Sequence, residues 1–162
     1  MTDKKLKAFI SMPYNPEWTD AVFKIIEEQC NKLNISATKI NSKVLTGDIV
    51  EAIFNEIDTS DMVIVDLTGN NPNVCAEAGY AIKHFGVKNM IFLNQNPSQS
   101  SFIFRNINQI KYMKPKNLRI SDLLQSPGTS ETNDAIQNKS FKKNLAEHLK
   151  LITQKLRRKS RI

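Results

Sequence analysis

The feature that most constrains the fold is the run DMVIVDL at residues 61–67. The residues between its two aspartates are all apolar, so both faces of a strand formed there would be hydrophobic. A strand with one face in water alternates apolar and polar residues, whereas a strand buried on both faces belongs to a parallel sheet that helices cover on each side. The run therefore predicts an α/β protein.

Shorter apolar segments before and after this run alternate with helical patterns. Further strands are predicted at residues 7–12, 35–40, 89–93 and, as a short one, 108–113. Helices are predicted at residues 19–33, 49–57, 73–84 and 141–156, because apolar residues recur there every three or four positions. Parallel strands joined by helices need right-handed crossovers. We therefore expect one doubly wound, flavodoxin-like parallel sheet with the strand order 2-1-3-4-5.

The length of the chain favours a single domain. With 162 residues, of which 40% are hydrophobic, the chain can form one core more readily than two. We expect residues 1–115 to form the α/β domain and residues 116–162 to add an irregular segment and a basic C-terminal helix packed on the same domain. The irregular part, residues 121–133, is rich in Ser, Pro, Gly and Thr.

No apolar run approaches the roughly 20 residues that cross a bilayer. The N-terminus is polar and leads directly into the first strand pattern. We therefore expect a soluble, cytoplasmic protein with no membrane partner.

The two cysteines, Cys30 and Cys75, lie in predicted helices and lack the spacing of a zinc site or a disulfide framework. We expect both to be free thiols in or near the core. Neither His84 nor His148 has a partner at a useful spacing. The sequence therefore predicts no catalytic histidine, no metal and no cofactor.

The net charge of +7 comes from the C-terminal end of the chain. No acidic residue follows Glu147, and the basic residues beyond it are Lys150, Lys155, Arg157, Arg158, Lys159 and Arg161. The rest of the domain is therefore close to neutral. Such an end is either a solvated helix or a surface for nucleic acid or another acidic partner.

A ligand site in a doubly wound sheet lies beyond the carboxyl ends of the strands, where the strand order reverses. Three predicted segments meet there: residues 11–18, 66–77 and 94–105. Asp66 ends the apolar central strand, and burying an unpaired carboxylate costs on the order of several kcal/mol. Asp66 therefore either braces the turn TGNNP that follows it or hydrogen-bonds to the hydroxyls of a ligand.

Glu77 lies four residues after Asn73, where the next helix is expected to begin. From there its carboxylate can point back into the crevice, and the positive end of a helix favours the ionised form that a nucleophile needs. The alternative is an ordinary glutamate in the first turn. Tyr80, one turn further on, can orient Glu77 or simply pack.

Other residues near the crevice allow two interpretations. Gly69 suits close approach of the backbone to a ligand, and it suits a turn equally well. The aromatic residues there can stack a base or belong to the core, and they are Tyr14, Trp18, Phe102 and Phe104.

Two blocks of the sequence resemble a known family. FISMPYNPEW and GDIVEAIFNEIDTSDMVIVDLTGNNPNVCAEAGYA are similar to the nucleoside 2-deoxyribosyltransferase-like superfamily and to its relatives among bacterial TIR-like nucleotide-binding domains. The resemblance covers residues 8–93, and its most specific part is VDLTGNNPNV followed by E-x-G-Y-A.

The resemblance implies that Glu77 is a nucleophile that attacks the anomeric carbon of the sugar. Asp66, as a second catalytic residue, would bind the sugar or manage a proton at the base. The ligand-binding residues that we predict from the resemblance and from the crevice are Ser11, Met12, Pro13, Tyr14, Asp48, Thr68, Gly69, Asn71, Asn73 and Tyr80. The resemblance also implies a homo-oligomer.

The chain departs from the family pattern at two positions. Ala78 replaces a leucine in the Glu-Leu-Gly-Tyr-Ala motif, which changes helix packing and leaves the chemistry in place. Ile103 stands where an aspartate commonly follows a phenylalanine, which puts the substrate contact of that loop in question.

Three hypotheses about function follow. The first is an N-glycosidase or deoxyribosyltransferase acting on a nucleoside, a nucleoside monophosphate or an NAD-like nucleotide. The second is a non-catalytic nucleotide-binding sensor or effector module of a bacterial defence or toxin system. The third is an interaction protein whose basic C-terminal helix docks on nucleic acid or an acidic partner.

Overall fold

The structure, a computed structural model, describes residues 4–14, 18–40, 48–114 and 133–159. The irregular segment predicted at residues 121–133 therefore lies outside the described residues, apart from Asn133.

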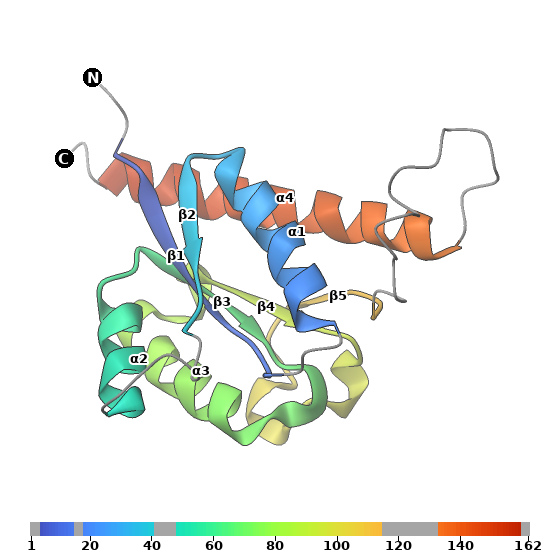
Figure 1. The fold of residues 1–162 in the computed structure, drawn as a ribbon, viewed down its shortest axis with the longest axis horizontal. Helices are drawn as coiled ribbons and strands as arrows, with labels where there is room; N and C mark the ends of the chain where they lie inside the picture. The colour runs from blue at the N-terminus through green and yellow to red at the C-terminus, as the bar shows by residue number, and fades with distance from the viewer. Residues whose placement is uncertain (1–3, 15–17, 41–47, 115–132, 160–162) are drawn as a thin grey trace.

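One five-stranded, all-parallel sheet has the order β2-β1-β3-β4-β5 (Figure 1), which confirms the predicted architecture. The strands are β1 (Leu6–Ser11), β2 (Ile35–Thr38), β3 (Met62–Asp66), β4 (Met90–Asn94) and β5 (Gln109–Lys111). The α-helices are α1 (Thr19–Asn31), α2 (Ile49–Asp58), α3 (Pro72–Phe85) and α4 (Asn133–Lys159). Short 3-10 helices are η1 (Thr68–Asn70), η2 (Val87–Asn89), η3 (Pro97–Gln99) and η4 (Phe102–Phe104).

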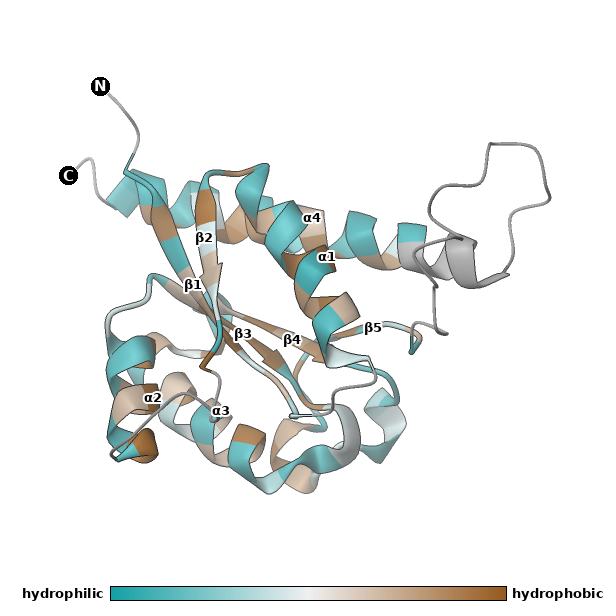
Figure 2. Cartoon of the chain, viewed as in Figure 1, coloured by the Kyte–Doolittle hydropathy of each residue, from teal (hydrophilic) through white to brown (hydrophobic). Residues whose placement is uncertain are grey.

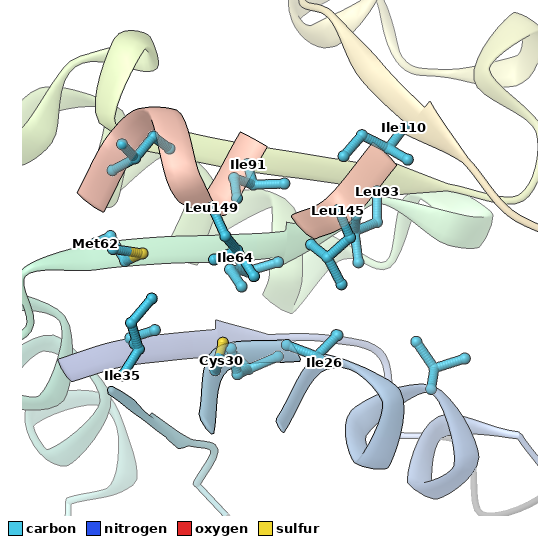
Figure 3. Close-up of a cluster of buried hydrophobic side chains, with 14 of the residues drawn as sticks. Ile26, Cys30, Ile35, Met62, Ile64, Ile91, Leu93, Ile110, Leu145 and Leu149 are labelled. Atoms are coloured by element: carbon cyan, nitrogen blue, oxygen red, sulfur yellow. The ribbon is translucent and has the colours of Figure 1, made fainter. Parts of the chain in front are cut away.

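Helices cover both faces of the sheet, as the run at residues 61–67 predicts. All five residues of β3 are buried, and β3 pairs with β1 on one side and β4 on the other. Met62 and Ile64 pack in the cluster formed with α1 and α4, whereas Val63 and Val65 pack in the cluster formed with α2 and α3. Figure 3 shows the first of these clusters, with Ile64 at its centre. In Figure 2 the inner strands are largely hydrophobic, while α1 and α4 mix hydrophilic and hydrophobic residues.

The C-terminal helix α4 belongs to the same packed unit. Its residues Phe141, Leu145, Leu149 and Ile152 are buried against α1 and the sheet. Lys143, Lys150 and Lys155 are exposed on the other side of α4, whereas Lys142 pairs with Glu28 of α1 and Arg157 donates to the Leu33 carbonyl. Burial of the apolar stripe therefore attaches α4 to the α/β domain.

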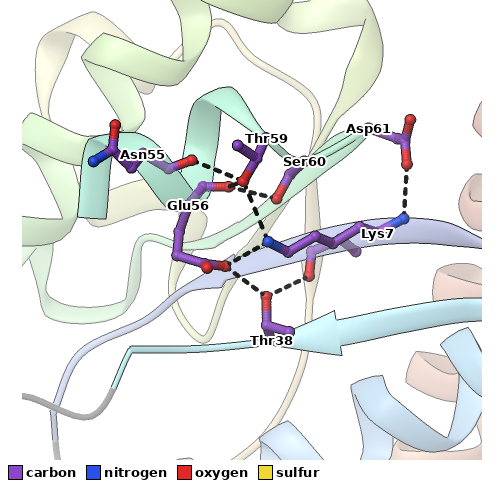
Figure 4. Close-up of polar contacts among 8 residues, drawn as sticks. Lys7, Thr38, Asn55, Glu56, Thr59, Ser60 and Asp61 are labelled. Carbon is purple, nitrogen blue, oxygen red and sulfur yellow. Dashed lines mark hydrogen bonds and ion pairs between the residues drawn. The ribbon is translucent and has the colours of Figure 1, made fainter. Parts of the chain in front are cut away.

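A polar cluster fixes α2 at the amino end of the sheet (Figure 4). The Lys7 ammonium lies 2.9 Å from the Glu56 carboxylate and donates to Thr59 Oγ1 at 3.3 Å. Thr38 Oγ1 donates to the same Glu56 carboxylate at 3.3 Å. The end of α2 is thus tied to both β1 and β2. This leaves the other end of α2, which begins at Ile49, at the carboxyl side of the sheet.

The second strand is shorter than the sequence predicts. Pairing between β1 and β2 ends at Phe9 and Thr38, so Lys39 and Ile40 continue beyond the sheet. Both residues instead line a cavity at its carboxyl side. Residues 35–40, which the sequence predicts as one strand, therefore form β2 followed by part of the cavity wall.

Both cysteines are free, with Cys30 buried and Cys75 half-buried. Burial raises the pKa of the Cys30 thiol to about 12, so this group is un-ionised and chemically inert at neutral pH. Among the helices that the structure describes, none is both long enough and apolar enough to cross a membrane.

Candidate functional site

Two adjoining cavities lie at the carboxyl side of the sheet, beside the point between β1 and β3 where the strand order reverses. Their volumes are about 150 Å³ and about 310 Å³. The wall that they share consists of Met12, Tyr14, Ile40, Ile53 and Glu77. The position is the one at which doubly wound sheets bind ligands.

Glu77 reaches this wall because of how α3 begins. Asn71 Oδ1 accepts hydrogen bonds from the backbone N–H groups of Asn73 (3.0 Å) and Val74 (3.3 Å), and Pro72 occupies the first helical position. This cap fixes the start of the helix. Glu77 then turns toward β1, where its Oε2 accepts a hydrogen bond from Ser11 Oγ at 2.5 Å.

The electrostatic setting of Glu77 differs from the expected one. The helix begins at Pro72, so Glu77 lies in the second turn, where the helix dipole has weakened. Burial instead raises the pKa of the Glu77 carboxyl above its usual value, and the Ser11 hydrogen bond acts in the opposite direction. The sequence analysis considered the helix end, which favours the ionised form, and did not consider burial, which favours the neutral form. The dominant influence is removal of the carboxylate from water.

The two cavities differ in chemistry. The smaller one is the more polar, because Thr19, Asp20 and Lys39 line it together with Glu77, although apolar residues such as Met12 and Ile53 line it as well. The larger one is mainly apolar, and its further lining residues are Ile49, Val50, Phe54, Asn71, Asn73, Val74 and Ala76. Glu77 therefore lies between a cavity of mixed, charged lining and a mainly apolar one.

Sequence reasoning missed Lys39 and Asp20. The Lys39 ammonium lies 2.7 Å from Asp20 Oδ1 and 4.7 Å from the centre of the Phe23 ring. One signal was available, since Lys39 follows a strand and Asp20 opens a helix after a neighbouring strand, at the same edge of the sheet. An ion pair across 19 positions has no sequence pattern of its own.

Asp66 does not share the site with Glu77. Its Oδ1 accepts hydrogen bonds from the Thr68 backbone N–H (3.0 Å) and Thr68 Oγ1 (2.6 Å), and its Oδ2 accepts one from the Tyr112 hydroxyl (2.5 Å). Among the described residues that line the two cavities, Asp66 does not appear. In β3 it alternates with Val65 and so projects to the same face as Ile64, toward Tyr112 and away from α3.

The arrangement at Asp66 matches the bracing alternative considered from the sequence. Burial raises the pKa of the Asp66 carboxyl, and the bonds from Thr68 and Tyr112 act in the opposite direction. Thr68 Oγ1 also accepts the Gln95 backbone N–H at 3.1 Å. Asp66 and Thr68 thus join the loops after β3 and β4 to Tyr112, which follows β5.

The other predicted ligand-binding residues divide into two groups. Met12, Pro13, Tyr14, Asn71 and Asn73 line one or both cavities, and Ser11 contacts Glu77 directly. Asp48, Gly69 and Tyr80 are not among the described lining residues.

Each residue of the second group has a structural role. Asp48 caps α2 by accepting hydrogen bonds from Val50 N (2.9 Å) and Glu51 N (3.3 Å). Gly69 adopts a φ of +72° in η1, so the turn requires it. The Tyr80 ring stacks on Phe54 with 4.1 Å between ring centres, and its hydroxyl donates to the Asp58 carboxylate at 2.9 Å. Tyr80 therefore supports the Phe54 wall of the larger cavity without orienting Glu77.

The aromatic candidates also divide. Tyr14 lines both cavities, whereas Trp18 and Phe104 are buried in the core. Phe102 is 85% exposed and lies in η4. Tyr14 is thus the candidate of this set that a bound base can reach.

Within the described ranges, no group of three or more His, Cys, Asp or Glu side chains is arranged to hold a metal ion. Comparison with protein-family models gives no match, and comparison with curated protein sequences gives none either.

Proposed function

We propose that this protein cleaves the N-glycosidic bond of a nucleoside or nucleotide, with Glu77 as the nucleophile. The observation that supports this proposal is the position of Glu77, a half-buried carboxylate held by Ser11 at 2.5 Å in the wall between a more polar and a mainly apolar cavity. A nucleoside has the same division, with an apolar, flat base on one side of the glycosidic bond and a polar sugar on the other. The resemblance of the sequence to nucleoside 2-deoxyribosyltransferase-like proteins supports the same assignment.

The larger cavity suits the base. Its volume is about 310 Å³, and Ile49, Val50 and Phe54 supply apolar surface against which a ring packs. Asn73 supplies an amide group that pairs with the polar edge of a base. In this arrangement the sugar lies at Glu77, at the junction with the smaller cavity.

The reaction would proceed in two displacements. Glu77 Oε1 attacks the anomeric carbon while the carbon–nitrogen bond breaks, and the base departs with the bonding electrons and takes a proton from water. Ser11 holds Oε2 during this step. Water or a second base then attacks the anomeric carbon, which breaks the ester and restores the carboxylate. Water gives hydrolysis, and a second base gives transfer.

The covalent intermediate offers a direct test. Nucleosides, nucleoside monophosphates and NAD should be incubated briefly with the protein, quenched in acid and examined by intact-protein and peptide mass spectrometry. The proposal expects base release together with a pentosyl or phosphopentosyl mass on the peptide that contains Glu77. Absence of both with every compound, from a folded protein, contradicts it.

The hydrogen bonds that Thr68 and Tyr112 donate to Asp66 favour one alternative function. Because Thr68 and Tyr112 occupy this carboxylate, the predicted second catalytic acid is not at the sugar position. A nucleotide-binding sensor or effector module, of the kind found in bacterial defence or toxin systems, needs no such acid. Saturable nucleotide binding without base release supports this alternative.

A further inference from the structure

The smaller cavity contains a cation that is held in place from two sides. Lys39 extends from the end of β2, and its ammonium lies 2.7 Å from Asp20 Oδ1 and 4.7 Å from the centre of the Phe23 ring. The side chain of Lys39 is 29% exposed, whereas that of Asp20 is 74% exposed. The Lys39 side chain is therefore partly sheltered at the cavity wall, while the Asp20 side chain is largely in water.

The Lys39 ammonium can exchange the Asp20 carboxylate for another anion at a small cost in free energy. An ion pair with a solvated partner contributes little stability, because water screens the attraction. A phosphate that enters the cavity offers the ammonium more charge and more acceptor oxygens than one carboxylate does. Asp20 can then return to water, while the Phe23 ring keeps its contact with the ammonium.

Lys39 and Glu77 line the same cavity with opposite charges. A neutral nucleoside at Glu77 would leave the Lys39 ammonium paired only with Asp20. A ligand whose sugar contacts Glu77 and which also carries a negative group complements both ends of the cavity. The charge pattern thus favours a phosphorylated ligand over a neutral one.

We propose that Lys39 is a specificity-determining residue that binds the phosphate of the ligand, so that the site takes a nucleoside phosphate in preference to the nucleoside. The inference rests on the proposed function in placing the sugar at Glu77. It adds the chemical class of the ligand and the residue that selects it.

Binding measurements test the inference without depending on turnover. Calorimetry at about 0.15 M salt should compare each nucleoside with its 5′-monophosphate, with ribose 5-phosphate and inorganic phosphate as probes that lack the base. The variants are Lys39→Met, Lys39→Arg, Asp20→Asn and, as the matched control, Lys143→Met. Lys143 is exposed on α4 and is not among the described lining residues, and its replacement changes the net charge equally.

The wild type should bind a monophosphate at least about tenfold more tightly than its nucleoside, and Lys39→Met should remove that preference, as loss of a hydrogen bond to a charged group predicts. Lys39→Arg should retain most of this preference for the monophosphate, and Lys143→Met should change it less than about twofold. Asp20→Asn should tighten monophosphate binding, because it frees the ammonium from its competitor. This opposite sign keeps the test valid where Lys39→Met fails to fold.

Several results would overturn the inference. Equal binding of nucleosides and monophosphates by the wild type would do so, as would an unchanged preference in Lys39→Met or weaker monophosphate binding in Asp20→Asn. The outcome is separable from catalysis. Lys39-dependent monophosphate binding without base release supports the inference and contradicts the glycosidase, whereas base release with no preference for phosphate does the reverse.

Discussion

Ser11 and Glu77, 66 positions apart in the chain, are joined by a 2.5 Å hydrogen bond that links the last residue of β1 to the second turn of α3. The hydroxyl donates to Oε2, so it stabilises the ionised carboxylate. Burial has the opposite and larger effect and raises the pKa of Glu77. The charge state of the proposed nucleophile thus depends on a balance that one substitution can shift.

Ser11→Ala should move the pH dependence of base release to higher pH. The nucleophile acts in its ionised form, so the rate rises as pH increases through the pKa of Glu77. Loss of the Ser11 bond removes an influence that lowers this pKa, and the midpoint therefore shifts upward. The midpoint of log kcat/KM against pH measures the shift. Ser140→Ala, on the exposed surface of α4, is the control, and an identical midpoint in Ser11→Ala would contradict the role of Ser11.

Glu77→Gln should stabilise the protein at neutral pH. In the wild type the folded-state pKa of Glu77 is raised, so its contribution to stability is present below the unfolded-state pKa and is lost as pH rises through the folded-state value. Glutamine does not ionise and avoids this loss. The melting temperature of Glu77→Gln relative to wild type should increase from pH 4 to pH 8. A difference that shrinks with rising pH would show that the folded site favours the ionised form.

Tyr112→Phe should destabilise the fold by about 1.5–3 kcal/mol, because the buried Asp66 carboxylate loses a charge-assisted hydrogen bond. Urea unfolding measures the change in free energy. Tyr80→Phe is the matched control, since its hydroxyl contacts Asp58 at the surface and its loss should cost much less stability. Base release by folded Tyr112→Phe should remain within about threefold of wild type, if Asp66 only braces its loop. A large loss of base release without a loss of stability would show that Asp66 has a catalytic role.

The two sides of α4 should respond differently to substitution. Ile152→Ala should lower the free energy of unfolding by about 2–4 kcal/mol, because Ile152 is buried in the cluster between α4, α1 and the sheet. Lys155→Gln, on the exposed side, should change stability by less than about 0.5 kcal/mol. Urea unfolding distinguishes them. Similar costs in stability would contradict the packing of α4. If a polyanion binds through the exposed side, it should dissociate from Lys155→Gln at a lower salt concentration than from the wild type.

The sequence predicted the fold well because its strongest signal is local. The apolar run at residues 61–67 forms the centre of the sheet, and the alternation of strands and helices predicts a parallel, doubly wound sheet, of which 2-1-3-4-5 is one of the common orders. The sequence also predicted Ser11, Tyr14 and Glu77 at the edge where they are found. Their positions depend mainly on where strands and helices end, and turn and cap residues mark those points.

The direction of side chains was harder to predict. Asp66 and Glu77 are close in the chain, but Asp66 projects to the α1 and α4 face of the sheet, where Tyr112 lies 46 positions further along the chain. No local sequence pattern indicates that Tyr112 is the hydrogen-bond partner of Asp66. The contact between Lys39 and Asp20 escaped prediction for the same reason, because ion pairs between separate elements leave no period in the sequence.

The central claim is that the Glu77 carboxylate forms the covalent bond, and base release by Glu77→Gln tests it most directly. The substitution keeps the size of the side chain and removes its charge. Release should be followed under saturating nucleotide, with binding checked by calorimetry and Glu147→Gln, on the exposed side of α4, as the control. We expect Glu77→Gln to bind within a few fold of wild type and to release base at least about 10³-fold more slowly, with Glu147→Gln unchanged. Comparable release by wild type and Glu77→Gln, both folded and saturated, would contradict the claim.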